Sequence, residues 1–287
     1  METCVKRVSG RRTTLRYMVR DVLRVRPGDL PDPRSTPVGP TSKQAARAAL
    51  PAIGARLAEL QEALYAEATR GVLLVLQGMD TSGKGGTIKH VAGLLNPLGL
   101  RIASFKSPTR EERRHDFLWR IRKQVPVPGQ IGVFDRSHYE DVLIVRVENL
   151  APDWEARYST INAFEAELAD SGITVIKCFL HISPREQKKR LLDRLNDPSK
   201  HWKYNPADLA ARAKWSAYQE AYAAVLARCS TPAAPWYVIP ADRKWYRNWA
   251  VASLLLETLE ALAPQPPRAD FDVQSELTRL TEHDPLA

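Results

Sequence analysis

Short apolar runs alternate with longer amphipathic stretches along most of the chain. The apolar runs predict five strands, near residues 72–77, 100–105, 131–135, 173–180 and 235–239. Apolar positions at helical spacing predict helices near 84–95, 111–123, 138–147, 154–171, 184–195, 206–228 and 242–263. This alternation indicates an α/β fold with a parallel five-stranded sheet and helices on both faces.

The two ends of the chain depart from this pattern. Residues 1–40 are basic and proline-rich, and we expect an arm that is partly ordered against the domain. Residues 42–70 carry Ala, Leu and Glu at helical spacing and predict a leading helix, with Pro51 as the place where it would break. We expect one domain over 41–264 and a polar tail over 265–287, in which 272–281 add a short helix.

Charge and composition narrow the class of protein. The 287 residues carry a net charge of +9, concentrated in segments 101–123 and 183–203. A polyanionic partner explains such a charge, and a solubilising surface is the alternative. We expect neither nucleic acid, because no aromatic platform interleaves with the cations, nor a membrane, because no apolar run approaches roughly 20 residues. Three cysteines without paired spacing indicate a reducing cytoplasm.

A glycine-rich loop directly follows the first predicted strand. Residues 78–87 read G-M-D-T-S-G-K-G-G-T, and Gly78, Gly83 and Lys84 match the G-x-x-x-x-G-K phosphate-loop spacing. Backbone N–H groups, the Lys84 ammonium and the following helix N-terminus all suit phosphate oxygens. The alternative is a glycine-rich turn with an accidental lysine. The expected phosphate-binding residues of the loop are Gly78, Thr81, Ser82, Gly83, Gly85, Gly86 and Thr87.

The loop departs from the usual pattern at one position. Gly85 follows Lys84 where Ser or Thr normally supplies a magnesium ligand. Asp80 is the available substitute, because a hard carboxylate suits Mg²⁺ and would repel phosphate unless a metal lay between them. We therefore predict Asp80 as a metal ligand, with Mn²⁺ as a substitute ion.

A second strand end supplies further candidates. Residues 131–135 form an apolar run that ends in Asp135, which we expect to hold metal beside Asp80, the alternative being a helix cap. Arg136 follows and presents a planar fork to phosphate. Glu140 is expected to orient the metal's waters or favour the helix dipole. We expect His138 to make a structural hydrogen bond. Arg120, on the preceding predicted helix, is a candidate for a second fork, and Arg146 is a weaker phosphate candidate.

The stretch 196–206 mixes cations with Trp202 and Tyr204 between two predicted helices. It suits a lid that closes over a nucleotide, with a ring available for base stacking. The alternative is a helical turn with its aromatic residues packed beneath it, and for Trp202 both interpretations remain open.

Five segments together resemble the type 2 polyphosphate kinases, over about residues 23–262. They are G-M-D-T-S-G-K-G-G-T, S-P-T-R-E-E-R-R-H-D-F-L-W-R, F-D-R-S-H-Y-E-D-V-L-I-V-R-V, L-N-D-P-S-K-H-W-K-Y-N-P and P-W-Y-V-I-P-A-D-R-K-W. The histidine-containing third segment is most similar to the class III subgroup, which accepts AMP and ADP. Asp135 stands where relatives often carry Asn, and Arg110 where an apolar residue or Pro is expected.

The resemblance implies a three-layer P-loop kinase fold like that of thymidylate kinase, with a helical lid at about 184–215 in the domain over 41–264. It implies metal at Asp80 and Asp135 and phosphate contacts from Lys84 and Arg136. Further basic positions near the polyphosphate path or the lid are Arg120, Arg190, Arg194, Lys200 and Lys203. It also implies a homo-oligomer, either a dimer or a tetramer.

These features lead to one expected function and its rivals. We expect a polyphosphate:nucleotide phosphotransferase that converts AMP to ADP and ADP to ATP, reversibly and with Mg²⁺, and guanine nucleotides are further candidate acceptors. Asp80, Lys84, Asp135, Arg136 and Glu140 are the expected catalytic residues. The rivals are an ATP-dependent nucleoside monophosphate kinase and a non-catalytic module that binds nucleotide or polyanion.

Overall fold

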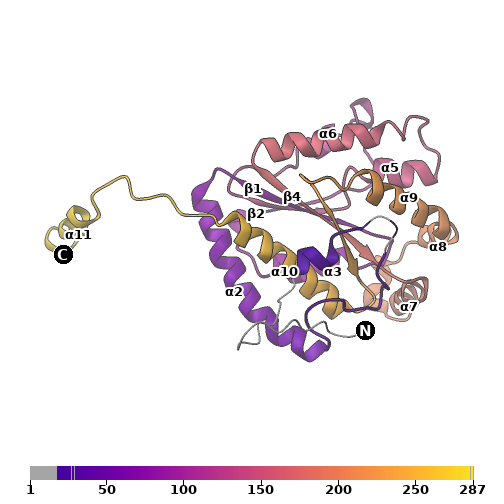
Figure 1. The fold of residues 1–287 in the computed structure, drawn as a ribbon, viewed down its shortest axis with the longest axis horizontal. Coiled ribbons are helices and arrows are strands. Elements are labelled where there is room, and N and C mark those ends of the chain that lie inside the picture. The colour runs from indigo at the N-terminus through magenta and orange to yellow at the C-terminus, as the bar shows by residue number, and fades with distance from the viewer. Residues whose placement is uncertain (1–17, 27, 29, 285, 287) are drawn as a thin grey trace, which may run out of the picture.

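The computed structural model describes residues 18–26, 28, 30–284 and 286. Five strands form one sheet in the order β2-β3-β1-β4-β5, and every pair of neighbours is parallel (Figure 1). The strands are β1 Gly71–Gln77, β2 Leu100–Ser104, β3 Ile131–Asp135, β4 Ile173–His181 and β5 Trp236–Pro240. This confirms the predicted α/β class and all five strands.

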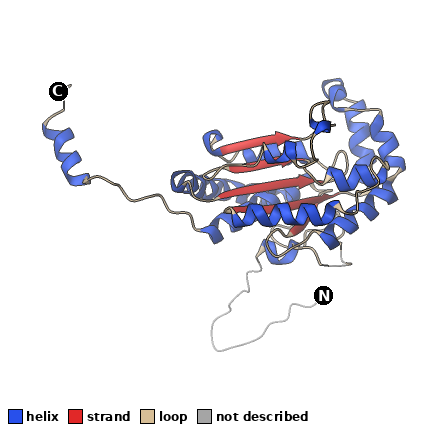
Figure 2. Cartoon of the chain, turned by 90° about the horizontal axis from the view of Figure 1, so that it is seen from above, coloured by secondary structure: helices blue, strands red, loops and turns tan. Residues whose placement is uncertain are grey.

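Helices cover both faces of the sheet (Figure 2). They are α1 Val19–Leu23, α2 Lys43–Glu67, α3 Lys84–Ala92, α4 Trp119–Arg122, α5 Glu140–Val147, α6 Arg157–Asp170, α7 Pro184–Leu195, α8 Ala207–Ala213, α9 Trp215–Arg228, α10 Lys244–Leu262 and α11 Val273–Glu282. Three short 3-10 turns are η1 Pro97–Gly99, η2 Glu112–Arg114 and η3 Pro198–Lys203.

The alternation of side chains along β1 divides the core into two layers. Val72, Leu74 and Leu76 pack on one face with α1, α2, α3 and α10. Leu73 and Val75 point to the opposite face and pack with α4 and α6, while α5 and α9 extend that layer over β4 and β5. Because both faces are covered, β1 is buried along its whole length, as its continuous apolar sequence predicts.

Two predicted helices are wrong in extent. Instead of one helix over 111–123 the chain forms η2 and α4, because Asp116 interrupts the run and its carboxylate accepts from the N–H of Leu118 at 2.9 Å. Instead of one helix over 206–228 the chain forms α8 and α9, with Lys214 between them at φ −93° and ψ 23°. Pro51 does not break α2, where it lies on the exposed side.

The arm over 1–40 is only partly within the described residues. From Met18 onward it packs on the domain: Val19 and Leu23 of α1 are buried in the core beside α10. The N–H groups of Val19 and Arg20 donate to the Glu257 carboxylate at 2.7 and 2.9 Å. Residues 1–17 lie outside the described part of the chain.

The opposite end of the chain leaves the domain altogether. After α10 the chain runs away from the body and ends in α11, which lies apart from every other element in both views (Figures 1 and 2). The short helix expected over 272–281 is confirmed, with Asp272 accepting from the N–H groups of Gln274 and Ser275 as its N-cap. None of the described helices is long and apolar enough to span a membrane.

Candidate active site

The glycine-rich loop connects the end of β1 to the start of α3, as predicted. Its backbone turns through left-handed conformations at Thr81 (φ 64°) and Gly83 (φ 105°). A Cβ at Gly83 would lie 1.7 Å from Nη1 of Arg247, so this position requires glycine for close approach as well as for its backbone angle. The loop therefore brings its backbone against a buried guanidinium of α10.

Two hydroxyl groups of the loop indicate what it binds. Oγ1 of Thr81 and Oγ of Ser82 are buried, and neither has a hydrogen-bond partner among the described residues. A buried hydroxyl without a partner costs free energy unless water or a ligand satisfies it. Phosphate oxygens fit here, because they accept from hydroxyl donors and from the N–H groups at the start of α3.

Lys84 is buried beneath the loop, and its ammonium donates to the carbonyl of Gly78 at 2.7 Å. Burial and the nearby Arg136 charge lower the pKa of Lys84, while the carboxylates of Asp80, Asp135 and Glu140 oppose that shift. The lysine is thus placed among three carboxylates and one guanidinium. This is an environment in which an added phosphate would favour its charged form.

Arg136 joins the carboxylates around Lys84. Its Nη2 lies 2.8 Å from Oδ1 of Asp80, and its Nη1 lies 3.7 Å from Oε2 of Glu140. Burial lowers the pKa of Arg136, but Glu140 and Asp80 more than offset that effect, so the pKa lies above its usual value. Arg136 also has a φ of 64°, a strained angle for a residue with a Cβ.

Asp80 and Asp135 lie at the carboxyl ends of the adjacent strands β1 and β3, where Leu76 pairs with Asp135. No group of three or more His, Cys, Asp or Glu side chains in the described chain could hold a metal. Mg²⁺ needs fewer protein ligands, because one or two carboxylates commonly hold it together with water and substrate phosphates. Asp80 keeps Oδ2 outside its Arg136 contact, so the donor set fits a hard divalent cation.

A buried polar network supports the turn that carries Arg136. Tyr139 and Lys177 contact the Glu165 carboxylate, and Nε2 of His138 lies 3.1 Å from Glu165 Oε1. Lys177 also donates to the carbonyl of Cys229 at 2.6 Å. The structural role expected for His138 is therefore confirmed, since its ring is fully buried and held by Glu165.

A cationic cavity of about 480 Å³ opens along one side of the loop. Its walls come from the loop, α2, α3, α7, η3 and α10. Eight lysine and arginine residues line it against one acid, Asp193; they are Lys43, Arg47, Arg190, Arg194, Lys200, Lys203, Lys244 and Arg247. Arg190, Arg194, Lys200 and Lys203, drawn from the basic segment 183–203, are thus brought together here, whereas no residue of the basic segment 101–123 lines this cavity.

Two buried arginines form the floor between the cavity and the loop. Arg190 donates to the carbonyls of Thr81 and Ser82 and to those of Ala241 and Asp242, so its guanidinium holds the loop in place. Arg247 donates to the Ser82 carbonyl at 3.1 Å. Burial and the Arg190 charge lower the pKa of Arg247. Two neighbouring buried cations repel each other, so an anion bound beside them would be stabilising.

The lid candidates lie at the outer wall of this cavity. Nη1 of Arg194 donates to the carbonyl of Lys203 at 2.8 Å and lies 3.4 Å from Oδ2 of Asp208. Trp202 is 78% exposed, with the Lys203 ammonium 4.9 Å from its ring centroid. The interpretation of Trp202 as a packed core residue is therefore wrong. Tyr204, two residues later, is half-buried.

Arg120 and Arg146, the two remaining arginine candidates, have different surroundings. Arg120 is buried, donates to the carbonyl of Lys106 at 2.7 Å and lies 3.8 Å from the Glu112 carboxylate. Arg146 stacks on Trp154, with its guanidinium carbon 4.9 Å from the ring centroid. Both sites hold their arginine through contacts within the protein.

Four cations of the cavity were missed from the sequence: Lys43, Arg47, Lys244 and Arg247. The first two lie on α2 and the others on α10, far from the loop in sequence. Lys244 belongs to a segment that carried the family resemblance, and that was the one signal for it. Lys43 and Arg47 looked like ordinary exposed cations of an amphipathic helix.

Residues 40–267 match the family model described as Polyphosphate kinase 2 (PPK2). The chain belongs to the polyphosphate kinase 2 family. An AMP/ADP-polyphosphate phosphotransferase of Meiothermus ruber is 52% identical over 83% of this chain and 90% of its own length. An ADP-polyphosphate phosphotransferase of Rhodopseudomonas palustris is 41% identical over 79% of this chain and 83% of its own length.

Solved structures agree with this assignment. The crystal structure of polyphosphate kinase 2 from Arthrobacter aurescens TC1 is 50% identical and superposes with a TM-score of 0.91, covering 93% of this chain and 98% of that one. The chain thus has the P-loop kinase fold of this family. Polyphosphate kinases 2 generally depend on a divalent metal, in agreement with the carboxylate pair at the ends of β1 and β3.

Proposed function

We propose that this polyphosphate kinase 2 transfers the terminal phosphoryl group of inorganic polyphosphate to AMP and to ADP, giving ADP and ATP. One observation carries the proposal: the phosphate loop lies between two different environments. A cationic cavity follows the loop at Thr81, Gly83 and Gly86, and the Asp80, Arg136 and Glu140 cluster lies outside the lining of that cavity. The name of the Meiothermus relative supports the same donor and both acceptors, and the name of the Rhodopseudomonas relative supports polyphosphate and ADP.

The cavity suits a polyphosphate chain as the donor. Eight cations against one acid supply charge along a path, which is what a flexible polyanion needs. Arg190 and Arg247 lie where the cavity meets the loop, so the terminal phosphates would lie against the N–H groups at the start of α3. A compact triphosphate would leave the contacts from η3 and α2 unused.

In the proposed step an oxygen of the acceptor phosphate attacks the terminal phosphorus of the chain in line. A new P–O bond forms, the bond to the bridging oxygen breaks, and the shortened chain leaves with that electron pair. One phosphoanhydride replaces another, so the reaction is reversible. A phosphate nucleophile needs no general base, and His138, buried against Glu165, is in no position to serve as one.

The chain's own residues would act by placing positive charge where the transferring group gains negative charge. Lys84 and the hydroxyls of Thr81 and Ser82 would bind its equatorial oxygens from the loop side. Arg136 would contact it from the acceptor side while Asp80 and Glu140 hold its fork in orientation. Little covalent work remains for the protein in such a transfer.

We propose Mg²⁺ as the metal, with Mn²⁺ as a substitute, held by Asp80 and Asp135. When bound it would neutralise charge on phosphate oxygens of both substrates. Asp135 adds a full charge where an amide would supply only a dipole, which strengthens the preference for a hard cation.

The direct test is nucleotide production from AMP, and separately from ADP, with polyphosphate and Mg²⁺ and without ATP. We expect ADP followed by ATP from the first reaction and ATP from the second. Product from ADP alone would remove AMP from the proposal. Product only when ATP replaces polyphosphate would make the protein a conventional nucleoside monophosphate kinase instead.

We further propose that the enzyme works in the cytosol as a homo-oligomer. Cys178 and Cys229 are buried free thiols, which suits a reducing compartment. Sedimentation of the full chain tests the second statement, and a monomer at every concentration would contradict it.

A further inference from the structure

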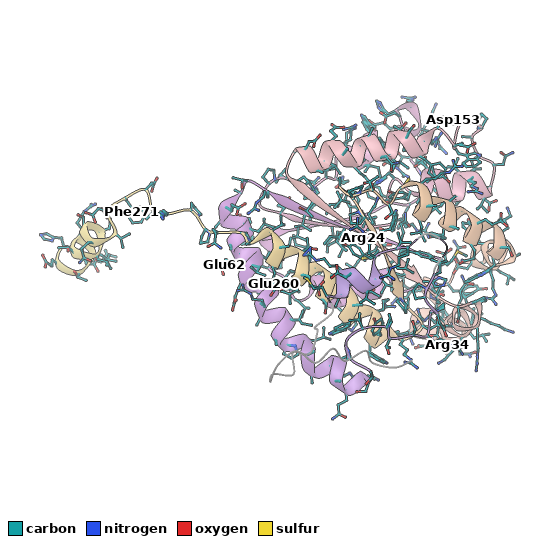
Figure 3. The ribbon with its side chains drawn as sticks, viewed as in Figure 1. Arg24, Arg34, Glu62, Asp153, Glu260 and Phe271 are labelled. Carbon is teal, nitrogen blue, oxygen red and sulfur yellow. The ribbon has the colours of Figure 1, made fainter. Side chains whose placement is uncertain are left out.

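The C-terminal helix α11 carries an apolar face that touches nothing within the described chain. Val273, Leu277 and Leu280 recur at i, i+4 and i+7, and each is exposed to solvent by half or more. Phe271 precedes them on the same tail, apart from the body (Figure 3). A ten-residue helix is too short to be stable in water by itself, so its stability depends on a surface that covers this face.

The linker carries the helix away from its own domain. The N–H of Gln265 donates to the Glu67 carboxylate at the end of α2, and this contact fixes the point where the tail leaves the body. Pro264, Pro266 and Pro267 then stiffen the next residues into an extended path. Both views show the tail continuing outward from this point (Figures 1 and 2).

The domain exposes apolar residues of its own on the edge strand β2 and on the segments that flank it. They are Tyr65, Leu98, Ile102 and Val127, all at least half exposed, and we call them the edge patch. A Cβ at Gly99 would lie 3.4 Å from Cδ2 of Tyr65, which places that ring beside Leu98. The N–H of Gly129, two residues after Val127, donates to Arg70 beside the tail's exit.

The charges of the two partners are complementary. Residues 265–287 contain five acidic and two basic side chains, a net charge of −3. The whole chain has a net charge of +9, so residues 1–264 carry +12. A second copy of this chain therefore attracts the tail electrostatically and offers an apolar surface for its helix.

We propose that α11 docks on the edge patch of a second copy of this chain, so that two subunits exchange their tails. Each exchange covers Val273, Leu277 and Leu280 with Leu98, Ile102 and Tyr65. A two-fold axis doubles the contact, because the same two surfaces meet on both sides.

The first experiment asks whether the contact forms between chains. Leu277→Cys in one chain and Leu98→Cys in a differently tagged chain, both in a Cys4→Ser background, are mixed and treated with a short bis-maleimide. We expect a cross-linked heterodimer on a denaturing gel. The matched control replaces Leu98→Cys with Leu209→Cys, another exposed leucine, on the lid helix α8. A heterodimer with the control but not with Leu98→Cys overturns the proposal. The absence of a heterodimer with either variant overturns it as well, and this is the result expected if the tail docks on its own domain.

The second experiment measures the energetic contribution of the helix face. We expect Leu277→Asp to raise the subunit Kd roughly a hundredfold, because docking would bury an unpaired charge. Thr278→Asp adds the same charge on the opposite side of α11 and leaves the Kd unchanged. Light scattering across a dilution series gives both values. Equal effects of the two variants, or none from either, would show that the apolar face is not the contact.

Discussion

The Arg136 guanidinium and the Asp80 carboxylate lie 2.8 Å apart, although 56 residues separate them in the chain. Asp80 belongs to the phosphate loop after β1, and Arg136 follows the last residue of β3. The two strands are neighbours in the sheet, so their carboxyl ends bring the pair together. Asp80, which is expected to hold metal, thus orients Arg136, which is expected to contact phosphate.

This contact predicts that Asp80 and Arg136 act as a unit. We expect Asp80→Asn and Arg136→Lys each to lower kcat/KM by about 10²-fold or more, and the double variant to lose less than the product of the two. Steady-state kinetics with polyphosphate and ADP measures all three. Arg122→Lys and Glu167→Gln, which alter an exposed ion pair at 2.8 Å, are the matched control and should leave kcat/KM nearly unchanged. If the free-energy effects of the two single variants add up to that of the double variant, Asp80 and Arg136 act independently.

Lys84→Ala should lower kcat by about 10²–10³-fold, because it removes the loop's one side-chain cation from the transferring group. Lys89→Ala, on the same helix but exposed, serves as control and should retain full activity. Thermal unfolding of both variants checks that the fold survives. Activity of Lys84→Ala close to that of the unchanged enzyme would exclude the lysine from the mechanism.

Changes to Lys43 and Arg47 in the cavity wall should affect the KM for polyphosphate but not the KM for ADP. We expect the pair Lys43→Ala and Arg47→Ala to raise the KM for polyphosphate about tenfold, with a weaker salt dependence, while the KM for ADP stays constant. Both residues are exposed on α2, so the fold should be unaffected. Arg56→Ala on the same helix, outside the cavity, is the control. A matching rise in the KM for ADP would argue against a separate donor path.

Polyphosphate should stabilise the fold through Arg190 and Arg247. Burial and the like charge of Arg190 lower the pKa of Arg247, so an anion placed beside the two guanidinium groups relieves a repulsion. We expect polyphosphate to raise Tm, and Arg247→Met to abolish most of that increase. An unchanged increase in the variant would place the anion elsewhere.

The buried His138 should make stability depend on pH. Burial lowers its pKa below 6.5, against the opposing effect of Glu165 and together with the nearby Lys177 charge. The unfolded state then binds a proton that the folded state does not, so the free energy of unfolding falls as pH decreases below about 6.5, by at most about 1.4 kcal/mol per pH unit.

His138→Gln should remove this contribution, because an amide can still hydrogen-bond Glu165 but does not titrate. Urea unfolding between pH about 7 and about 5 measures the slope. The remaining slope combines His181, whose pKa burial also lowers, with Asp141, whose pKa burial raises to about 6 and whose contribution therefore has the opposite sign. Glu165 has a lowered pKa as well, with the same sign as His138, but its contribution is lost only below about 4.5. An unchanged slope in the variant would mean that His138 is charged in the fold.

Local sequence was sufficient for the sheet and for naming the candidate residues that lie together at the phosphate loop. The apolar runs of β1 and β3 are buried on both faces, so their composition alone marks them as strands. The phosphate loop spacing is likewise a local pattern, because one short turn must place several N–H groups around one anion. Asp80, Lys84, Asp135 and Arg136 could therefore be named before any contact between them was known.

Tertiary structure decided what lies around that centre. Lys43 and Arg247 reach the cavity because α2 and α10 pack together on one face of the sheet, a relationship that no local spacing records. The sequence also does not show that the Arg190 guanidinium donates hydrogen bonds to the loop carbonyls, or that Arg136 pairs with Asp80. The physical reason is that side-chain pattern fixes which face of an element is buried, whereas the partner it meets there is set by how the chain crosses between strands.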